Sequence, residues 1–276
     1  MAEAEKDDGQ AQYQLALLHL AGEDVNGEPL EQSEEIAFGW LTKASKHNVV
    51  EAEVELGDFN LEGRGIPINP TEAARLYRAA ADQGNMEAEA RLGWISAHGL
   101  GVSWDGEEAL RRYTNADHGG SAFGLWGLAD MYLTGNGVVR NHELGMSYGV
   151  KAAEMGCAPA LLQMGLLMLA GSDNPSIAEH AIAYIHQAAQ AGDAEAQYLY
   201  MMIYAEGIGV TPWPNTVRWW GQRLSAAARR GRAEAQWYWG LALENGLTGH
   251  SDLSQARASI SQSADKGFPE IGRAHV

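Results

Sequence analysis

The chain has 276 residues and an apolar content of 46%, which is enough for one or two globular domains with a substantial core. Its 36 acidic and 19 basic residues give a formal net charge of −17, which repels phosphate, so nucleic acid is not expected as a partner. The single cysteine, Cys157, excludes an internal disulfide framework and a cysteine-based zinc site.

The chain carries no visible membrane or export signal. No apolar run approaches the 18 or so residues of a membrane-spanning helix, so membrane insertion is not expected. The first ten residues, MAEAEKDDGQ, lack the basic and apolar regions of a signal peptide. We therefore expect a cytoplasmic protein, or a periplasmic or exported one if a signal peptide has been removed.

A repeated unit runs along the chain. The stretch GDAEAQYLYMMIYAEGIGV (Gly192 to Val210) matches GNMEAEARLGWISAHGLGV (Gly84 to Val102) in its opening glycine, its Glu-Ala and its closing Gly-x-Gly-Val. A small residue opens the first segment of each unit, at Ala11, Ala52, Ala88, Gly124, Ala160, Ala196 and Ala235, in steps of 41, 36, 36, 36, 36 and 39 residues. Four equal steps in a row indicate a true repeat. The predicted units are residues 8–48, 49–84, 85–120, 121–156, 157–192, 193–231 and 232–267, with an incomplete eighth at 268–276.

Each unit is predicted to fold as two helices joined by a loop. The first segment, such as residues 52–63 or 235–246, carries small and apolar residues at i, i+4, i+5 and i+8, which form one face of a helix. Paired loop glycines follow at Gly63 and Gly65, Gly99 and Gly101, Gly135 and Gly137, and Gly207 and Gly209. The first of each pair stands where a helix end favours a left-handed backbone. An alanine-rich second helix comes next, and none of the eight prolines interrupts a proposed helix.

Three units depart from this pattern in their loops. The first has a longer, acidic loop, GEDVNGEPLEQSEE; the fifth has Asp173 in place of its second loop glycine; and the sixth contains TPWPN. Because one hairpin cannot cover its own apolar face, the units are expected to stack into one solenoid. At about 8–10 Å between neighbouring helices, seven units predict a bowed rod on the order of 70 Å long.

The pattern Ala-x-Tyr-x-Leu-Gly-x-x-Tyr-x-x-Gly-x-Gly-Val, followed by a helix that ends in Ala-Ala-x-x-Gly, resembles the Sel1-like repeat family, which is related to tetratricopeptide repeats. It is seen in AQYLYMMIYAEGIGV, ARLGWISAHGLGV and GLWGLADMYLTGNGV, and the resemblance covers roughly residues 8 to 272. The resemblance implies an all-α fold: a right-handed α/α solenoid of about seven helical hairpins, forming a single domain over residues 1–276.

The resemblance also implies a function, namely a non-enzymatic scaffold without cofactor or metal that binds a protein or peptide in a concave groove. In related repeats the groove-facing positions lie two, six and nine residues after the opening small residue. These positions hold Tyr13, Trp126, Tyr198 and Trp237, then Asp58, Trp94 and Asp130, then Glu244. Aromatic anchors among carboxylates suit peptide capture. The alternative is that the aromatic residues two positions in pack between helices.

A second candidate surface lies near the C-terminal end. No acid occurs from Gly207 to Ala233, whereas five arginines do, interleaved with tryptophans: Trp213, Arg218, Trp219, Trp220, Arg223, Arg229, Arg230 and Arg232. Residues 1–72 hold 16 acids and 4 bases. This contrast predicts docking of an acidic partner, or a homo-oligomer formed by end-to-end contact. The alternative is solvated arginines, with tryptophans that fill a gap between repeats.

Signals for catalysis are sparse. Ser263 and Lys266, in the stretch SADK, match the Ser-x-x-Lys spacing of penicillin-interacting enzymes, but a Lys-Thr-Gly companion is absent. The alternative function is therefore a cell-wall-related enzyme that uses these two residues. Within the scaffold interpretation, the compact size and acidity also suit a bacterial immunity protein that occludes a toxic effector.

Overall fold

The computed structural model describes residues 8–22, 28–171, 174–208, 214–249 and 251–268. Within these ranges all regular structure is helical and no β-strand is present. Part of the first acidic loop, Asp173 and most of the TPWPN stretch, with Trp213, lie outside the described residues. No helix in the described ranges is both long and apolar enough to cross a membrane.

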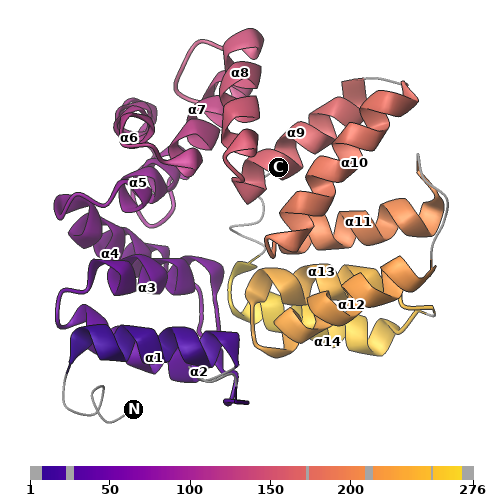
Figure 1. The fold of residues 1–276 in the computed structure, drawn as a ribbon, viewed down its shortest axis with the longest axis horizontal. Helices are drawn as coiled ribbons and strands as arrows, with labels where there is room; N and C mark the ends of the chain where they lie inside the picture. Colours follow the sequence, from indigo (N-terminus) through magenta and orange to yellow (C-terminus); the bar gives the residue numbers. More distant parts are fainter. Residues whose placement is uncertain (1–7, 23–27, 172–173, 209–213, 250, 269–276) are drawn as a thin grey trace.

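The described helices form seven consecutive hairpins, one for each predicted unit (Figure 1). They are α1 (Gly9–Ala21) and α2 (Glu34–Ser45), α3 (Val50–Glu62) and α4 (Pro70–Asp82), α5 (Met86–His98) and α6 (Gly106–His118), α7 (Ala122–Thr134) and α8 (His142–Glu154), α9 (Ala158–Gly171) and α10 (Pro175–Gln190), α11 (Ala194–Glu206) and α12 (Pro214–Arg229), and α13 (Ala233–Glu244) and α14 (Leu253–Asp265).

The ends of these helices follow from local chemistry. The first helices α3, α5, α7 and α11 end at glycines with φ of 66°, 63°, 84° and 73°, namely Gly63, Gly99, Gly135 and Gly207, which confirms the predicted left-handed caps. The second helices α4, α10 and α12 begin at prolines, where no helical hydrogen bond is lost. Asn69, Asp105 and Asn141 cap α4, α6 and α8 with side-chain oxygens.

Within a hairpin, the two helices approach closely because a tyrosine packs against a glycine. The Tyr77 ring is fully buried, and a Cβ at Gly57 would lie 2.3 Å from its Cε1 atom. Tyr113 stands in the same relation to Gly93 in the next hairpin. The glycine of the first helix and the tyrosine of the second are therefore complementary parts of one repeated packing unit.

The hairpins follow one another around a ring, so that α1 and α2 lie beside the C-terminal helices (Figure 1). The amide of Gly65 donates to the carbonyl of Gly231 at 3.2 Å, and Arg232 Nε lies 3.1 Å from Glu34 Oε1. This curvature exceeds that of the predicted open rod. The attraction between an acidic N-terminal end and an arginine-rich end is realised within one chain, and a homo-oligomer stays a prediction.

Candidate partner-binding groove

A groove with a volume of about 430 Å³ lies on the inner side of the ring, lined by side chains from the first helices of successive hairpins and by Phe268. Counted from the opening small residue of each unit, lining residues stand at −1 (Glu195, Glu234), +3 (Gln163, Tyr238), +6 (Asp130, Leu166) and +10 (His98, Thr134). Steps of four, three and four residues trace one face of a helix. The repeat therefore presents the same helix face to the groove in each unit.

Two of the predicted groove residues line this groove. Trp126 is buried, its ring centroid lies 4.8 Å from that of Phe123, and its indole Nε1 has no hydrogen-bond partner among the described residues. Asp130 lies one turn further along α7 and accepts a hydrogen bond of 3.3 Å from Gln163 Nε2. Burial raises the pKa of Asp130, while nearby His98 and the Gln163 hydrogen bond lower it less strongly.

Two other predicted groove residues, Trp94 and Asp58, make side-chain contacts with other residues of the chain. Trp94 is buried and its ring lies against that of His98, with ring centroids 4.6 Å apart and the planes tilted by 33°, and its carbonyl oxygen lies 2.8 Å from His98 Nδ1. Asp58 accepts a 2.6 Å hydrogen bond from the Tyr77 hydroxyl and lies 3.4 Å from Arg91 Nε. The Asp58 carboxylate therefore has both an internal hydrogen bond and an internal ion pair.

The remaining predicted groove residues lie outside the lining. Tyr13 packs against the N-terminal apolar cluster, and Glu244 is exposed at the end of α13. The Tyr198 hydroxyl accepts a 2.9 Å hydrogen bond from Asn245. The Trp237 ring lies 6.4 Å from that of Phe268, which does line the groove.

Sequence reasoning missed three acidic residues of the groove: Asp193, Glu195 and Glu234. All three are half-buried, and in the described part of the chain none forms an ion pair. Burial raises the pKa of Asp193 to about 6, raises that of Glu195, and raises that of Glu234 well above its usual range. The recurring Glu-Ala of the repeat contained this signal, because its glutamate occupies the −1 position.

The neighbouring wall of the ring, on α3 and α5, carries several acids that are paired, and Glu34 at the start of α2 shares one of their arginines. Arg64 Nε lies 3.0 Å from Glu34 and its NH1 atom lies 3.5 Å from Glu55. Arg91 joins Asp58 and Glu87, each at 3.4 Å, and its guanidinium lies 4.1 Å from the centre of the Phe123 ring. These arginines pair with Glu55, Asp58 and Glu87 of this wall, whereas Glu62, at the end of α3, forms no ion pair with a described residue and burial raises its pKa.

The arginine- and tryptophan-rich region divides into outer and inner parts. Arg218, Arg223 and Arg229 are exposed on α12, and the Arg223 guanidinium lies 4.9 Å from the centre of the Trp219 ring, which is 50% exposed. Trp220 is buried between helices, as the packing alternative predicts. Arg230 and Arg232 instead contact residues of the N-terminal hairpins.

The Ser-x-x-Lys residues have structural partners. Ser263 is fully buried and donates a 2.7 Å hydrogen bond to the carbonyl of Ala233. Lys266 Nζ donates to the carbonyls of Gly63, at 3.4 Å, and Gly231. A Ser-Asp-Asn triplet is present at residues 172–174, and its Asn174 side chain caps α10. The Ser263 hydroxyl and the Lys266 ammonium therefore both make hydrogen bonds to backbone carbonyls of the chain.

Comparison with known proteins agrees with this architecture. The Sel1 repeat matches residues 9–49, 50–85, 87–111, 122–157, 158–193 and 233–268. A Sel1 repeat protein from Oxalobacter formigenes is 26% identical, with a TM-score of 0.52 over 98% of this chain and 76% of that one. The protective antigen c5321 of uropathogenic Escherichia coli, described as having an SLR fold, is 27% identical, with a TM-score of 0.50. The match covers 98% of this chain and 56% of that one.

A third similar structure is the immunity protein Pa5087 from Pseudomonas aeruginosa, with 17% identity, a TM-score of 0.51, and coverage of 94% of this chain and 81% of that one. At this identity the likeness shows the fold. Curated protein sequences give no match. The repeat period, the fourteen described helices and the matched segments together show that the chain belongs to the Sel1 repeat family.

Proposed function

We propose that this chain is an interaction scaffold that holds a basic segment of a partner protein in its groove. Sel1 repeat proteins mediate protein–protein interactions, and the groove supplies the chemistry for one class of partner. The observation that carries the proposal is the set of half-buried groove carboxylates, Asp193, Glu195 and Glu234, without an ion pair among the described residues.

A lysine or arginine side chain would complement this set. A carboxylate that is partly removed from water loses hydration, and a cation in contact with it restores part of that loss. Burial already opposes ionisation of Glu195 and Glu234, so the unoccupied groove carries an electrostatic cost that a basic partner relieves. Tyr238 and Phe268, beside these acids, offer aromatic surface for apolar or cationic side chains.

The test is capture of a partner from the source cells, followed by titration of the identified protein against variants. Glu195→Gln combined with Glu234→Gln removes two groove charges and should weaken binding about 10- to 100-fold. The control, Glu107→Gln with Glu143→Gln, removes the same charge from exposed positions on α6 and α8 and should leave affinity unchanged. Equal affinity of the groove variant and the wild type would reject the proposal.

The inhibitor form of this function, in which the captured partner is a toxic effector, has its own test. Likeness to the immunity protein Pa5087 makes that form a natural candidate for this fold. Co-expression of the effector with the wild-type chain should protect cells, and co-expression with the Glu195→Gln, Glu234→Gln variant should not. Equal survival with and without the wild-type chain would reject the inhibitor form and leave partner binding in place.

A second surface, on the outer side of α12, suits an acidic partner. Arg218, Arg223 and Arg229 are exposed there, and no ion pair engages them in the described part of the chain. Reversing the charge of all three should weaken binding of an acidic partner without unfolding the chain. A captured partner that binds this triple variant with wild-type affinity does not use this surface.

A further inference from the structure

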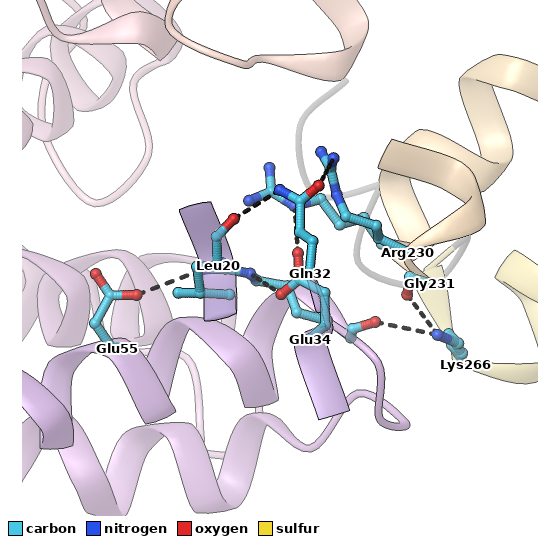
Figure 2. A network of polar contacts seen from close by, with 10 residues as sticks. Leu20, Gln32, Glu34, Glu55, Arg230, Gly231 and Lys266 are labelled. Atoms are coloured by element: carbon cyan, nitrogen blue, oxygen red, sulfur yellow. Dashed lines mark hydrogen bonds and ion pairs between the residues drawn. The ribbon is translucent and has the colours of Figure 1, made fainter. Parts of the chain in front are cut away.

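The two ends of the solenoid meet through a defined set of polar contacts, 166 to 203 residues apart in sequence (Figure 2). The loop after α3 approaches the turn between α12 and α13 and the end of α14. The amide of Gly65 donates to the Gly231 carbonyl at 3.2 Å, and the amide of Ile68 donates to the Lys266 carbonyl at 3.0 Å. Two backbone hydrogen bonds of this kind fix the relative position of the two ends.

A buried carboxylate lies at the centre of this contact. The Glu34 side chain is 3% exposed and lies 3.0 Å from Arg64 Nε and 3.1 Å from Arg232 Nε. Arg64 belongs to the N-terminal end, whereas Arg232 comes from the C-terminal end. Because a buried carboxylate needs its cationic partners, the pair with Arg232 stabilises the closed arrangement in particular.

Further donors complete the contact. Arg230 NH1 donates to Gln32 Oε1 at 3.2 Å, and Gln32 in turn donates to the Leu20 carbonyl at 2.7 Å (Figure 2). Lys266 Nζ donates to the Gly231 carbonyl of its own end and, at 3.4 Å, to the Gly63 carbonyl across the contact.

Glycines allow the two backbones to come this close. A Cβ added at Gly231 would lie 3.3 Å from Gly65 Cα, and Gly231 has a φ of 88°. Sequential hairpins, in contrast, share buried apolar side chains, which form one cluster from Ala16 to Leu76 and a second from Leu61 to Ala242. The closing contact is thus made mainly by the hydrogen bonds and ion pair described above, with Ala233 close to Gly63 beside them.

We infer that this contact, formed by Gln32, Glu34, Gly65, Arg230, Gly231, Arg232 and Lys266, is a clasp that holds the solenoid as a closed ring and can open without unfolding the hairpins. Each hairpin keeps its own core and neighbours when the clasp opens, because solenoid stability is a sum of local terms. Opening would separate the loop after α3 from the turn before α13 and from the end of α14.

The test measures the distance across the clasp in the full chain. Spin labels at Glu31→Cys and Arg229→Cys, two exposed positions that flank the clasp, are introduced with Cys157→Ala, and the distance is measured by double electron–electron resonance. The wild-type clasp should give one short, narrow distribution. Arg232→Gln should add a longer population, and Arg232→Gln with Lys266→Met should make it dominant. Arg257→Gln, which removes an exposed charge from α14, should leave the distribution unchanged.

The possible results distinguish opening of the clasp from unfolding and from contact between copies of the chain. Circular dichroism must show wild-type helix content in the opened variants; if the double variant is unfolded, the single variant decides. A short distance that survives in every folded variant would overturn the clasp, as would a long distance in the otherwise wild-type chain. A short distance in a mixture of singly labelled chains would place the contact between copies, which also overturns the inference.

Discussion

The α3–α5 wall of the ring and the α11–α13 wall both carry carboxylates, but these differ in their partners. Asp58, on the first wall, accepts a hydrogen bond from Tyr77 and lies 3.4 Å from Arg91. Glu195 and Glu234, on the second, have no ion pair with a described residue. A carboxylate that is paired with an arginine stabilises the folded chain. A half-buried carboxylate without a cation instead destabilises it until a ligand supplies a cation. The paired carboxylates of the first wall are therefore structural, and Glu195 and Glu234 of the second are available for binding.

Among the charged groups, the largest expected effect comes from breaking the first wall. Arg64→Ala leaves Glu55 without its cation and leaves the buried Glu34 with Arg232 as its one remaining described cation, so it should lower the free energy of unfolding by about 2–3 kcal/mol. Urea denaturation followed by circular dichroism measures this. Arg75→Ala, which breaks the exposed pair with Glu72, should lower it by at most about 0.5 kcal/mol. Equal losses in the two variants would contradict a structural role for the first wall.

A second variant separates packing from binding at Trp126. Trp126→Ala should lower the free energy of unfolding by about 3 kcal/mol, because the indole is buried against Phe123. Trp126→Phe keeps most of the apolar volume and should cost less than about 1.5 kcal/mol. Weaker partner binding by the folded Trp126→Phe variant would place the indole in the binding surface, and unchanged binding would limit its role to packing.

Removing a charge from the second wall should stabilise the chain. Asp193→Asn keeps the side-chain oxygen that caps α11 by accepting from the Ala196 amide at 2.7 Å. The folded pKa of Asp193 is raised to about 6, so the folded chain holds an extra proton between about pH 4 and 6, and its stability falls as the pH rises through that window. Asp193→Asn should match the wild type below about pH 4 and exceed it by about 1–2 kcal/mol above pH 6.

Denaturation of Asp193→Asn and wild type from pH 3.5 to 8 checks both the sign and the window. An advantage that grows as the pH falls would contradict the burial argument. In the presence of a basic partner the order should reverse, because the variant lacks one of the charges that the partner contacts.

The helices could be predicted from sequence because their determinants are local. The 36-residue period, the capping glycines such as Gly63, and the absence of proline inside helices each act within one unit. The groove face was predicted only in part: Trp126 and Asp130 line it, whereas Glu195 and Glu234 do not stand at the positions expected from related repeats. These two glutamates recur with the repeat, so the pattern indicates its register and does not by itself indicate a binding face.

Ring closure could not be predicted in the same way. Curvature accumulates from small rotations at every interface between hairpins, and no single unit specifies the total. The charge contrast between residues 1–72 and the arginines near the C-terminal end indicated attraction, but sequence cannot distinguish contact within a chain from contact between copies. Glu34 and Arg232 are 198 residues apart, and only the folded arrangement brings them to 3.1 Å.

The smallest expected effect concerns charges that face solvent on the outside of the ring. Arg223 lies over the half-exposed Trp219 ring, a contact worth about 0.5–1 kcal/mol at an exposed site. Arg223→Gln should therefore lower the free energy of unfolding by less than about 1 kcal/mol, and in a Trp219→Ala background it should cost less, because only the 5.6 Å contact with the Trp220 ring remains. This double-mutant cycle, read by urea denaturation, isolates the pair. Arg218→Gln, with no described ion pair, should change stability by at most about 0.5 kcal/mol, and a larger loss would show that the outer arginines support the fold as Arg64 does.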